Sequence, residues 1–196
     1  MTDFRIFTEG KSDVVFLRDY IESIFGIKLP NNKFDVLGSW SGYKQGGSIY
    51  PNIELSLSNK EEIILVLDAD VNFEQRQAEV MDDFKRFGIP IHLFLFPGNN
   101  QVGNREDLLT VIASDRKLIS CFLSYEQCVK DYNLHLEKSR IFAYLDVLLP
   151  SVSKTENNDM RKDEKRDYKM PDHWDLHHAY LQPLHDFLSP FFIETT

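Results

Sequence analysis

Hydrophobic and polar positions alternate along this chain with two different periods. Short runs rich in apolar and β-branched residues, typical of buried parallel strands, predict strands at residues 5–9, 34–37, 63–67 and 91–96. Apolar residues three and four positions apart predict helices between these strands, at residues 12–25, 48–58 and 73–87. Because this order of elements requires right-handed crossovers, the pattern predicts an α/β fold whose parallel sheet has about four strands flanked by helices.

The pattern changes beyond about residue 115, where only helical spacing remains. Apolar stripes predict three further helices, at about residues 119–132, 141–149 and 176–187. A stretch of mixed charge at about 151–171 has almost no apolar residues, and we expect it to be a mobile loop. Cys121 and Cys128 are seven residues apart in the first of these helices, so we expect two buried thiols on one face. The sequence thus predicts an α/β core over residues 1–115 and a helical C-terminal extension over residues 116–196 that packs on the core.

Composition and charge narrow the functional classes. With 196 residues, 42% of them hydrophobic and 27% charged, the chain is typical of a globular domain with a sizeable core. No apolar run approaches the ~20 residues that span a bilayer, so we expect no membrane partner. The chain enters its first strand without a signal-peptide pattern and has only two cysteines, which favours a cytoplasmic location. The net charge of −9 argues against a generic nucleic-acid-binding surface.

Acidic residues follow two of the predicted strands directly. Glu9 and Gly10 end the first strand, with Asp13 just beyond them, and Asp68 and Asp70 follow the apolar run of the third strand. The carboxyl ends of parallel strands are where open α/β sheets bind ligands. Carboxylates at such an edge repel one another unless a cation lies among them, and Mg²⁺ favours oxygen ligands. The sequence therefore predicts a divalent-metal site.

These two motifs, in this order and on these strands, resemble the toprim domain. The resemblance covers roughly residues 3–113, and it implies a Rossmann-like toprim fold. A further segment, residues 96–109, is similar to stand-alone toprim-like proteins of unknown function, although Arg105 stands where those proteins usually have Leu. Such proteins are related to the toprim domain of overcoming-lysogenization-defect nucleases. The resemblance implies metal-dependent phosphoryl transfer on nucleic acid, most simply endonuclease cleavage.

The resemblance also implies roles for single residues at the end of the first strand. Glu9 would be a metal ligand or a general base. Gly10 would let the backbone turn tightly beside it. Lys11 would neutralise charge on the scissile phosphate.

The remaining acids would complete the metal site that the resemblance implies. Asp68 and Asp70 would hold Mg²⁺, with Mn²⁺ as a substitute. Asp13 would complete a second metal position, which Glu106 or Asp107 would approach from the fourth strand's side. Two ions ~4 Å apart stabilise the attacking and leaving oxygens of phosphodiester cleavage.

Other functions stay open at this point. A non-catalytic toprim-like module that binds nucleic acid or a protein partner, or a second copy of the chain, fits the net negative charge. A haloacid-dehalogenase-like phosphatase also places Asp-x-Asp after an apolar strand, but there the strand is usually the first and a Thr or Val stands where this chain has Asn72. Structural roles compete as well, because Asp13 suits the first turn of a helix and Asp68 or Asp70 suits a helix cap.

Overall fold

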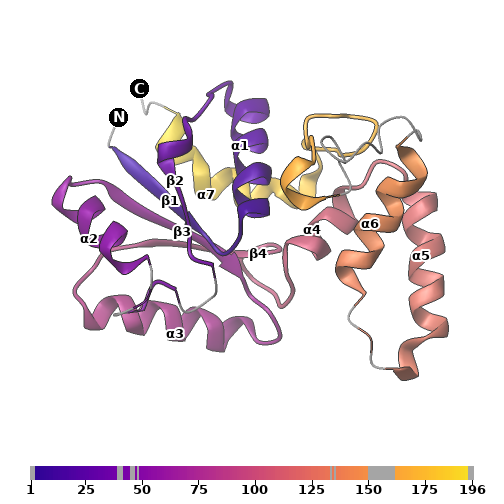
Figure 1. The fold of residues 1–196 in the computed structure, drawn as a ribbon, viewed down its shortest axis with the longest axis horizontal. Helices are drawn as coiled ribbons and strands as arrows, with labels where there is room; N and C mark the ends of the chain where they lie inside the picture. Colours follow the sequence, from indigo (N-terminus) through magenta and orange to yellow (C-terminus); the bar gives the residue numbers. More distant parts are fainter. Residues whose placement is uncertain are drawn as a thin grey trace.

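The computed structural model describes residues 3–38, 42–44, 47, 49–132, 134, 136–149 and 162–193. Its centre is an all-parallel sheet with the strand order β2-β1-β3-β4, which confirms the predicted α/β class (Figure 1). All four strands lie within two residues of the predicted positions: β1 (Phe4–Thr8), β2 (Phe34–Val36), β3 (Glu62–Asp68) and β4 (His92–Phe96).

Helices cover both faces of the sheet. Side chains at alternate strand positions point to opposite faces, so Ile6, Ile64 and Phe94 belong to one core and Phe7 and Leu65 to another. The first core is closed by α1 (Lys11–Phe25) and α7 (Gln182–Phe192), and the second by α2 (Tyr50–Ser58) and α3 (Phe73–Arg86). The result is a three-layer sandwich in which the central strands β1 and β3 are buried on both faces.

Local capping explains where the helices that border the strand ends begin. The N-cap of α1 is Gly10, and Asp13 in its first turn accepts a hydrogen bond from the Gly10 amide at 2.7 Å. Helix α4 (Arg105–Ile112) begins after its N-cap Asn104, whose side chain accepts a hydrogen bond from the Asp107 amide at 3.1 Å. Both helices therefore start at the carboxyl edge of the sheet.

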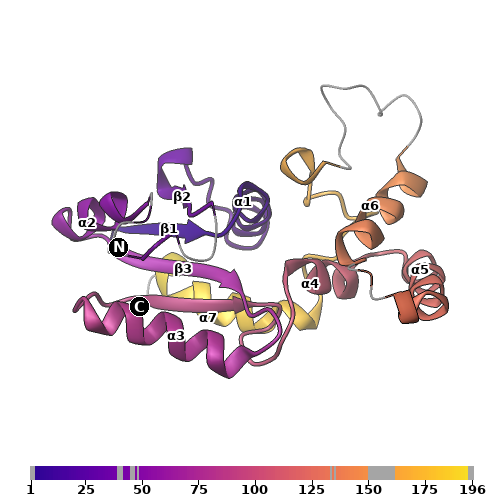
Figure 2. The same cartoon turned by 60° about the horizontal axis from the view of Figure 1, so that its bottom comes forward.

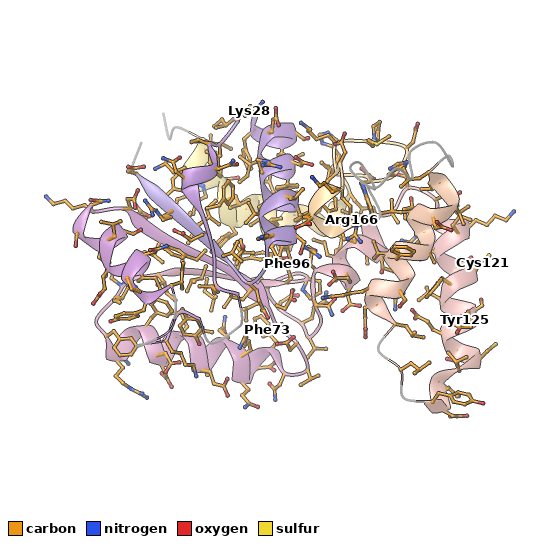
Figure 3. All side chains as sticks on the ribbon, in the orientation of Figure 1. Lys28, Phe73, Phe96, Cys121, Tyr125 and Arg166 are labelled. Carbon is orange, nitrogen blue, oxygen red and sulfur yellow. The ribbon has the colours of Figure 1, made fainter. Side chains whose placement is uncertain are left out.

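Two further helices lie beyond that carboxyl edge. Helix α6 (Glu137–Leu148) packs on α4, and α5 (Arg116–Cys128) packs on α6, to one side of the sheet (Figure 2). Only Ile119 of α5 is buried, because the helix has a single neighbour to pack against. The prediction that Cys121 and Cys128 are buried is wrong, since both thiols are exposed, and Cys121 lies on the helix far from the sheet (Figure 3).

The segment before α7 is ordered where the structure describes it. Residues 151–161 of the predicted mobile loop lie outside the described residues. Residues 162–171 do not behave as a mobile loop, because Arg166 and Tyr168 are buried and the Tyr168 amide donates to Asp19 at 3.0 Å. The predicted helix from 176 to 187 is also displaced: α7 starts at Gln182, after a 3₁₀ turn.

Short 3₁₀ helices complete the described structure, at Asn31–Lys33, Lys130–Tyr132, Asp163–Lys165 and Ala179–Leu181. Within the described ranges, no helix has both the length and the apolar character needed to cross a bilayer.

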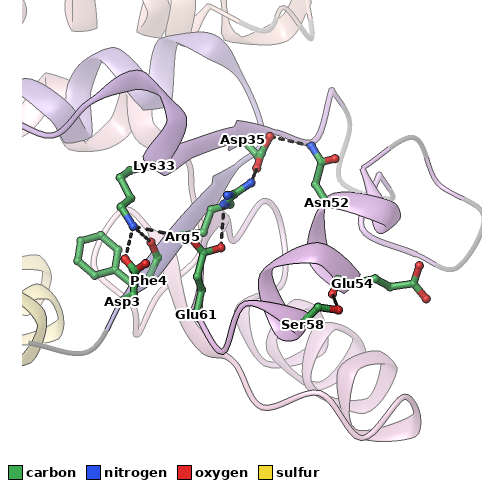
Figure 4. A network of polar contacts seen from close by, with 9 residues as sticks. All are labelled: Asp3, Phe4, Arg5, Lys33, Asp35, Asn52, Glu54, Ser58 and Glu61. Carbon is green, nitrogen blue, oxygen red and sulfur yellow. Dashed lines mark hydrogen bonds and ion pairs between the residues drawn. The ribbon is translucent and has the colours of Figure 1, made fainter.

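The amino end of the sheet is held by a network of charged side chains, which we call the amino-end network (Figure 4). Arg5 lies 3.3 Å from Asp35 and 3.1 Å from Glu61. Lys33 pairs with Asp3 and lies 3.8 Å from Glu61. These ion pairs tie the starts of β1, β2 and β3 together.

Candidate functional site

The sheet brings Glu9 and Asp68 to one edge. Strands β1 and β3 are parallel neighbours, and Thr8, the last residue of β1, is level with Val66 of β3. Glu9 follows Thr8 directly, and Asp68 is the last residue of β3. Helices α1 and α4 start at the same edge and contribute Asp13 and Glu106. We call this group, with Asp70, the acidic edge.

Asp68 is the electrostatic centre of the acidic edge. One of its oxygens accepts a hydrogen bond from the Arg105 amide at 3.0 Å, at the first turn of α4. Burial, together with the nearby carboxylates of Asp13, Glu9 and Glu106, raises the pKa of Asp68 to about 8. The charges of three other elements therefore act on this one carboxyl group, which places it where a cation would be most strongly attracted.

Glu9 is half-buried beside Arg76, which belongs to α3. Its Oε2 lies 3.7 Å from Nη2 of Arg76, which is too far for a hydrogen bond, and this oxygen is buried with no hydrogen-bond partner among the described residues. Burial raises the pKa of Glu9 despite the charge of Arg76, and Asp70 and Asp13 add to the rise. Arg76 also donates to the Asp68 carbonyl at 3.3 Å, so it supports both strand ends.

Asp13 and Glu106 are both engaged by the buried guanidinium of Arg105. Nη1 lies 2.8 Å from Asp13 and Nη2 lies 2.6 Å from Glu106, and the Arg105 side chain is only 2% exposed. Burial alone would raise the pKa of Glu106, but Arg105 outweighs it and holds that pKa below its usual value. Arg105 therefore joins the start of α1 to the start of α4.

Asp70 differs from the other four acids of the acidic edge in its exposure to solvent. It is exposed and has a φ of 55°, in the left-handed region that Asp tolerates better than most residues. Two backbone hydrogen bonds with Gly103, of 2.9 and 2.7 Å, hold it in place. A side chain at position 103 would clash, because a Cβ there would lie 2.7 Å from Asp107 Oδ2. The loop after β3 is thus clamped to the loop before α4.

Gly10 and Lys11, at the start of α1, were also predicted to have functional roles. Gly10 has φ −133° and ψ 164°, an extended conformation open to any residue, and a Cβ there would meet nothing closer than 3.6 Å. The expectation that Gly10 is needed for a tight turn is therefore wrong. Lys11 is exposed at the first position of α1.

The acidic edge is not arranged as a preformed metal site. Among the described residues, no three metal-binding side chains are close enough together to hold an ion without rearrangement. Asp13 and Glu106 form ion pairs with Arg105. Glu9 and Asp68 lie at the same edge of the sheet, and Glu9 has a buried oxygen without a hydrogen bond among the described residues. The donors that remain are hard carboxylate oxygens, the type that Mg²⁺ and Mn²⁺ prefer.

Sequence reasoning assigned no role to the two arginines of the site. Arg76 lies three residues after Phe73 and four before Val80, so it falls on the inward stripe of α3. Arg105 lies three and four residues before Leu108 and Leu109, on the inward stripe of α4. A basic residue on an apolar stripe is the signal that identifies both, because burial of a guanidinium requires acidic partners.

Comparisons of the chain with protein-family models, with curated proteins and with solved structures found no match. The resemblance to toprim domains therefore stays a prediction, and the function has to be argued from the site.

Proposed function

We propose that the chain is a divalent-metal-dependent enzyme that transfers phosphoryl groups on nucleic acid, most simply by phosphodiester cleavage. In this proposal Glu9 and Asp68, with Asp70 beside them, hold a single Mg²⁺ or Mn²⁺ ion. The observation that carries the proposal is the convergence of Glu9, Asp13, Asp68 and Glu106 from four elements on the carboxyl edge of the sheet. Carboxylates gathered this closely are unfavourable without a cation, so the arrangement favours a cation-dependent function.

The surroundings of the acids suit a phosphate substrate. Helices α1 and α4 start at this edge, and the partial positive charge of a helix start attracts anions. Lys11 is exposed in the first turn of α1, where its ammonium group can reach a phosphate that approaches the edge. A bound divalent ion supplies Lewis-acid stabilisation of charge on phosphoryl oxygens.

Glu9 has the properties of a general base. In the metal-free protein the pKa of Glu9 is raised above its usual value, which suits a general base; in that role Glu9 would not itself be a ligand of the ion. Arg76, close to Glu9 and bonded to the Asp68 carbonyl, would keep the two strand ends in register while a proton moves. Glu9 and Lys11 are therefore the proposed catalytic residues, with Arg76 as a positioning residue.

One observation favours a second candidate function, a non-catalytic module that binds nucleic acid or a protein. Arg105 already neutralises two of the five acids, so part of the acidic edge is compensated without any metal. In that case the helix starts and Lys11 would bind an anionic partner, and no bond would be broken.

Metal titration combined with cleavage assays tests the two functions. Mn²⁺ binding is measured by calorimetry for the wild type, Glu9→Gln and Asp68→Asn, with Glu54→Gln as the control because Glu54 is an exposed acid on α2. The same proteins are incubated with nicked, single-stranded and structured nucleic acids in Mg²⁺ and in Mn²⁺.

The proposal expects both site variants to lose metal binding and cleavage, with the Glu54 variant unchanged. Metal binding that survives both site substitutions would show that the site is wrong. Metal binding without cleavage of any substrate would favour the binding module. Hydrolysis of small phosphate esters that depends on Asp68 alone would favour a phosphatase.

A further inference from the structure

The acidic edge contains a permanent cation of its own. Arg105 is the first residue of α4, yet its side chain is 2% exposed, whereas a first-turn arginine usually extends into solvent. The guanidinium remains charged under all ordinary conditions, since arginine does not lose its proton in proteins. A fixed positive charge is therefore built into a group of acids.

The contacts of Arg105 are those that a bound cation would make. Its two terminal nitrogens lie 2.8 Å from Asp13 and 2.6 Å from Glu106, which belong to α1 and α4. Its backbone amide donates to Asp68 at 3.0 Å. One residue thus neutralises two acids and orients a third, and it does so from within the polypeptide.

We propose that the Arg105 guanidinium takes the place of a second metal ion, so that the chain works with one exchangeable divalent ion beside a fixed cation. This inference rests on the proposed function for its single ion, and it adds that Asp13 and Glu106 are ligands of arginine and not of metal. Arg105 is accordingly a positioning residue: it fixes the start of α4 against the start of α1 and so orients Asp68 towards the ion held with Glu9.

The number of bound Mn²⁺ ions per chain tests this inference without any nucleic acid. Equilibrium dialysis is carried out on the wild type, on Arg105→Met, and on Arg105→Met combined with Asp13→Asn and Glu106→Gln. Methionine keeps much of the length of arginine but removes its charge. We expect one ion in the wild type, two in the single variant and one in the triple variant, because only the single variant exposes two unneutralised acids.

Two conservative variants keep the test valid if Arg105→Met does not fold. Asp13→Asn and Glu106→Gln each leave Arg105 one carboxylate, and each should still bind one ion. A variant chain of Arg105→Met that is unfolded alone, folds when Mn²⁺ is added and then holds two ions also supports the inference, because the second ion replaces the missing charge.

The outcomes separate this inference from the proposed function. Two ions in the wild type, with one lost in Asp13→Asn, would overturn the role of Arg105 and leave the metal-dependent function standing. A folded Arg105→Met that binds no additional ion would also overturn it. No ion in the wild type but one in Arg105→Met would support the role of Arg105 and contradict the proposed function. No ion in either protein would contradict both.

Discussion

The two ends of the sheet both carry acidic side chains, but their charges are balanced in different ways. At the amino end, each of Asp3, Asp35 and Glu61 lies within 4 Å of Arg5 or Lys33. At the carboxyl end, the acidic edge has five acids and two buried arginines, and within the described residues neither Asp68 nor Asp70 has a cationic side chain within ion-pair distance.

We propose that this difference separates charges that hold the fold together from charges that bind a ligand. The ion pairs at the amino end join β1, β2 and β3, so we expect the protein to lose stability when one partner of a pair is removed. At the carboxyl end, burial and the neighbouring carboxylates raise the pKa values of Asp68 and Glu9, which is unfavourable for the protein alone. Destabilising arrangements of this kind are typical of functional sites. The predictions below test whether the two ends differ in this way.

The largest effect is expected when Arg105 loses its charge. Arg105→Met leaves Asp13 and Glu106 buried without a cation, and breaking a buried ion pair in this way costs about 3–5 kcal/mol. Arg5→Met at the amino end should cost less, about 1–3 kcal/mol, because Asp35 is 18% exposed and can be hydrated, and the buried Glu61 keeps Lys33 at 3.8 Å. Urea unfolding without metal measures both values. Equal losses would mean that the two ends have the same balance of charge.

Removing an acid should have opposite effects at the two ends. Asp68→Asn keeps an oxygen for the Arg105 amide and removes a repelled charge, so at pH 8 it should stabilise the metal-free protein, on the order of 1 kcal/mol. Glu61→Gln removes the partner of Arg5 and Lys33 and should destabilise the protein by about 1–3 kcal/mol. Thermal unfolding of the two variants beside the wild type distinguishes the signs. A destabilised Asp68→Asn would show that Asp68 is a structural acid.

The pH dependence of stability should follow from the raised pKa of Asp68. The folded protein holds the Asp68 proton up to about pH 8, whereas the unfolded chain loses it near pH 4. Ionising this group therefore favours unfolding, and the metal-free protein should lose stability as the pH rises from about 4 to about 8. Glu9 acts in the same direction.

Urea unfolding at several pH values measures this slope. It should be less than about 1.4 kcal/mol per pH unit from Asp68, since one group releases at most one proton. The slope should flatten in Asp68→Asn and in saturating Mg²⁺. An unchanged slope in Asp68→Asn would assign it to other groups.

The fold could be predicted from the sequence because its strands are buried on both faces. Short apolar runs such as residues 63–67 are typical of strands buried on both faces, and in a parallel sheet the acids that follow such strands reach the carboxyl edge together. The start of α7 could not be placed, because Leu176 and Leu181 are buried within a turn and a 3₁₀ segment whose spacing resembles that of a helix. Periodic apolar residues indicate which side chains are buried, but they do not show whether the buried segment is a helix or a turn.

The composition of the acidic edge was only half predictable. Glu9 and Asp68 follow strands, so their position depends on topology alone. The pairing of Asp13 with Arg105 joins residues 92 positions apart and depends on the packing of α1 against α4. The buried position of Arg105 could be suspected from the stripe of α4, but its partners follow only from three-dimensional distances.

The smallest effect is expected from substitution of Gly10. This substitution tests whether the acidic edge needs a glycine backbone at this position as well as its charged side chains. Gly10→Ala should change stability by less than about 0.5 kcal/mol, because the extended conformation accepts alanine and the Cβ has room. Gly103→Ala is the matched contrast: its φ of 126° and the 2.7 Å approach to Asp107 should cost about 1–3 kcal/mol. Chemical unfolding of both variants and Mn²⁺ binding to Gly10→Ala provide the measurements. A strongly destabilised Gly10→Ala that still binds Mn²⁺ would show that the glycine has a structural role. A stable variant with normal Mn²⁺ binding would leave Glu9 and Asp13 as the functional residues of this motif.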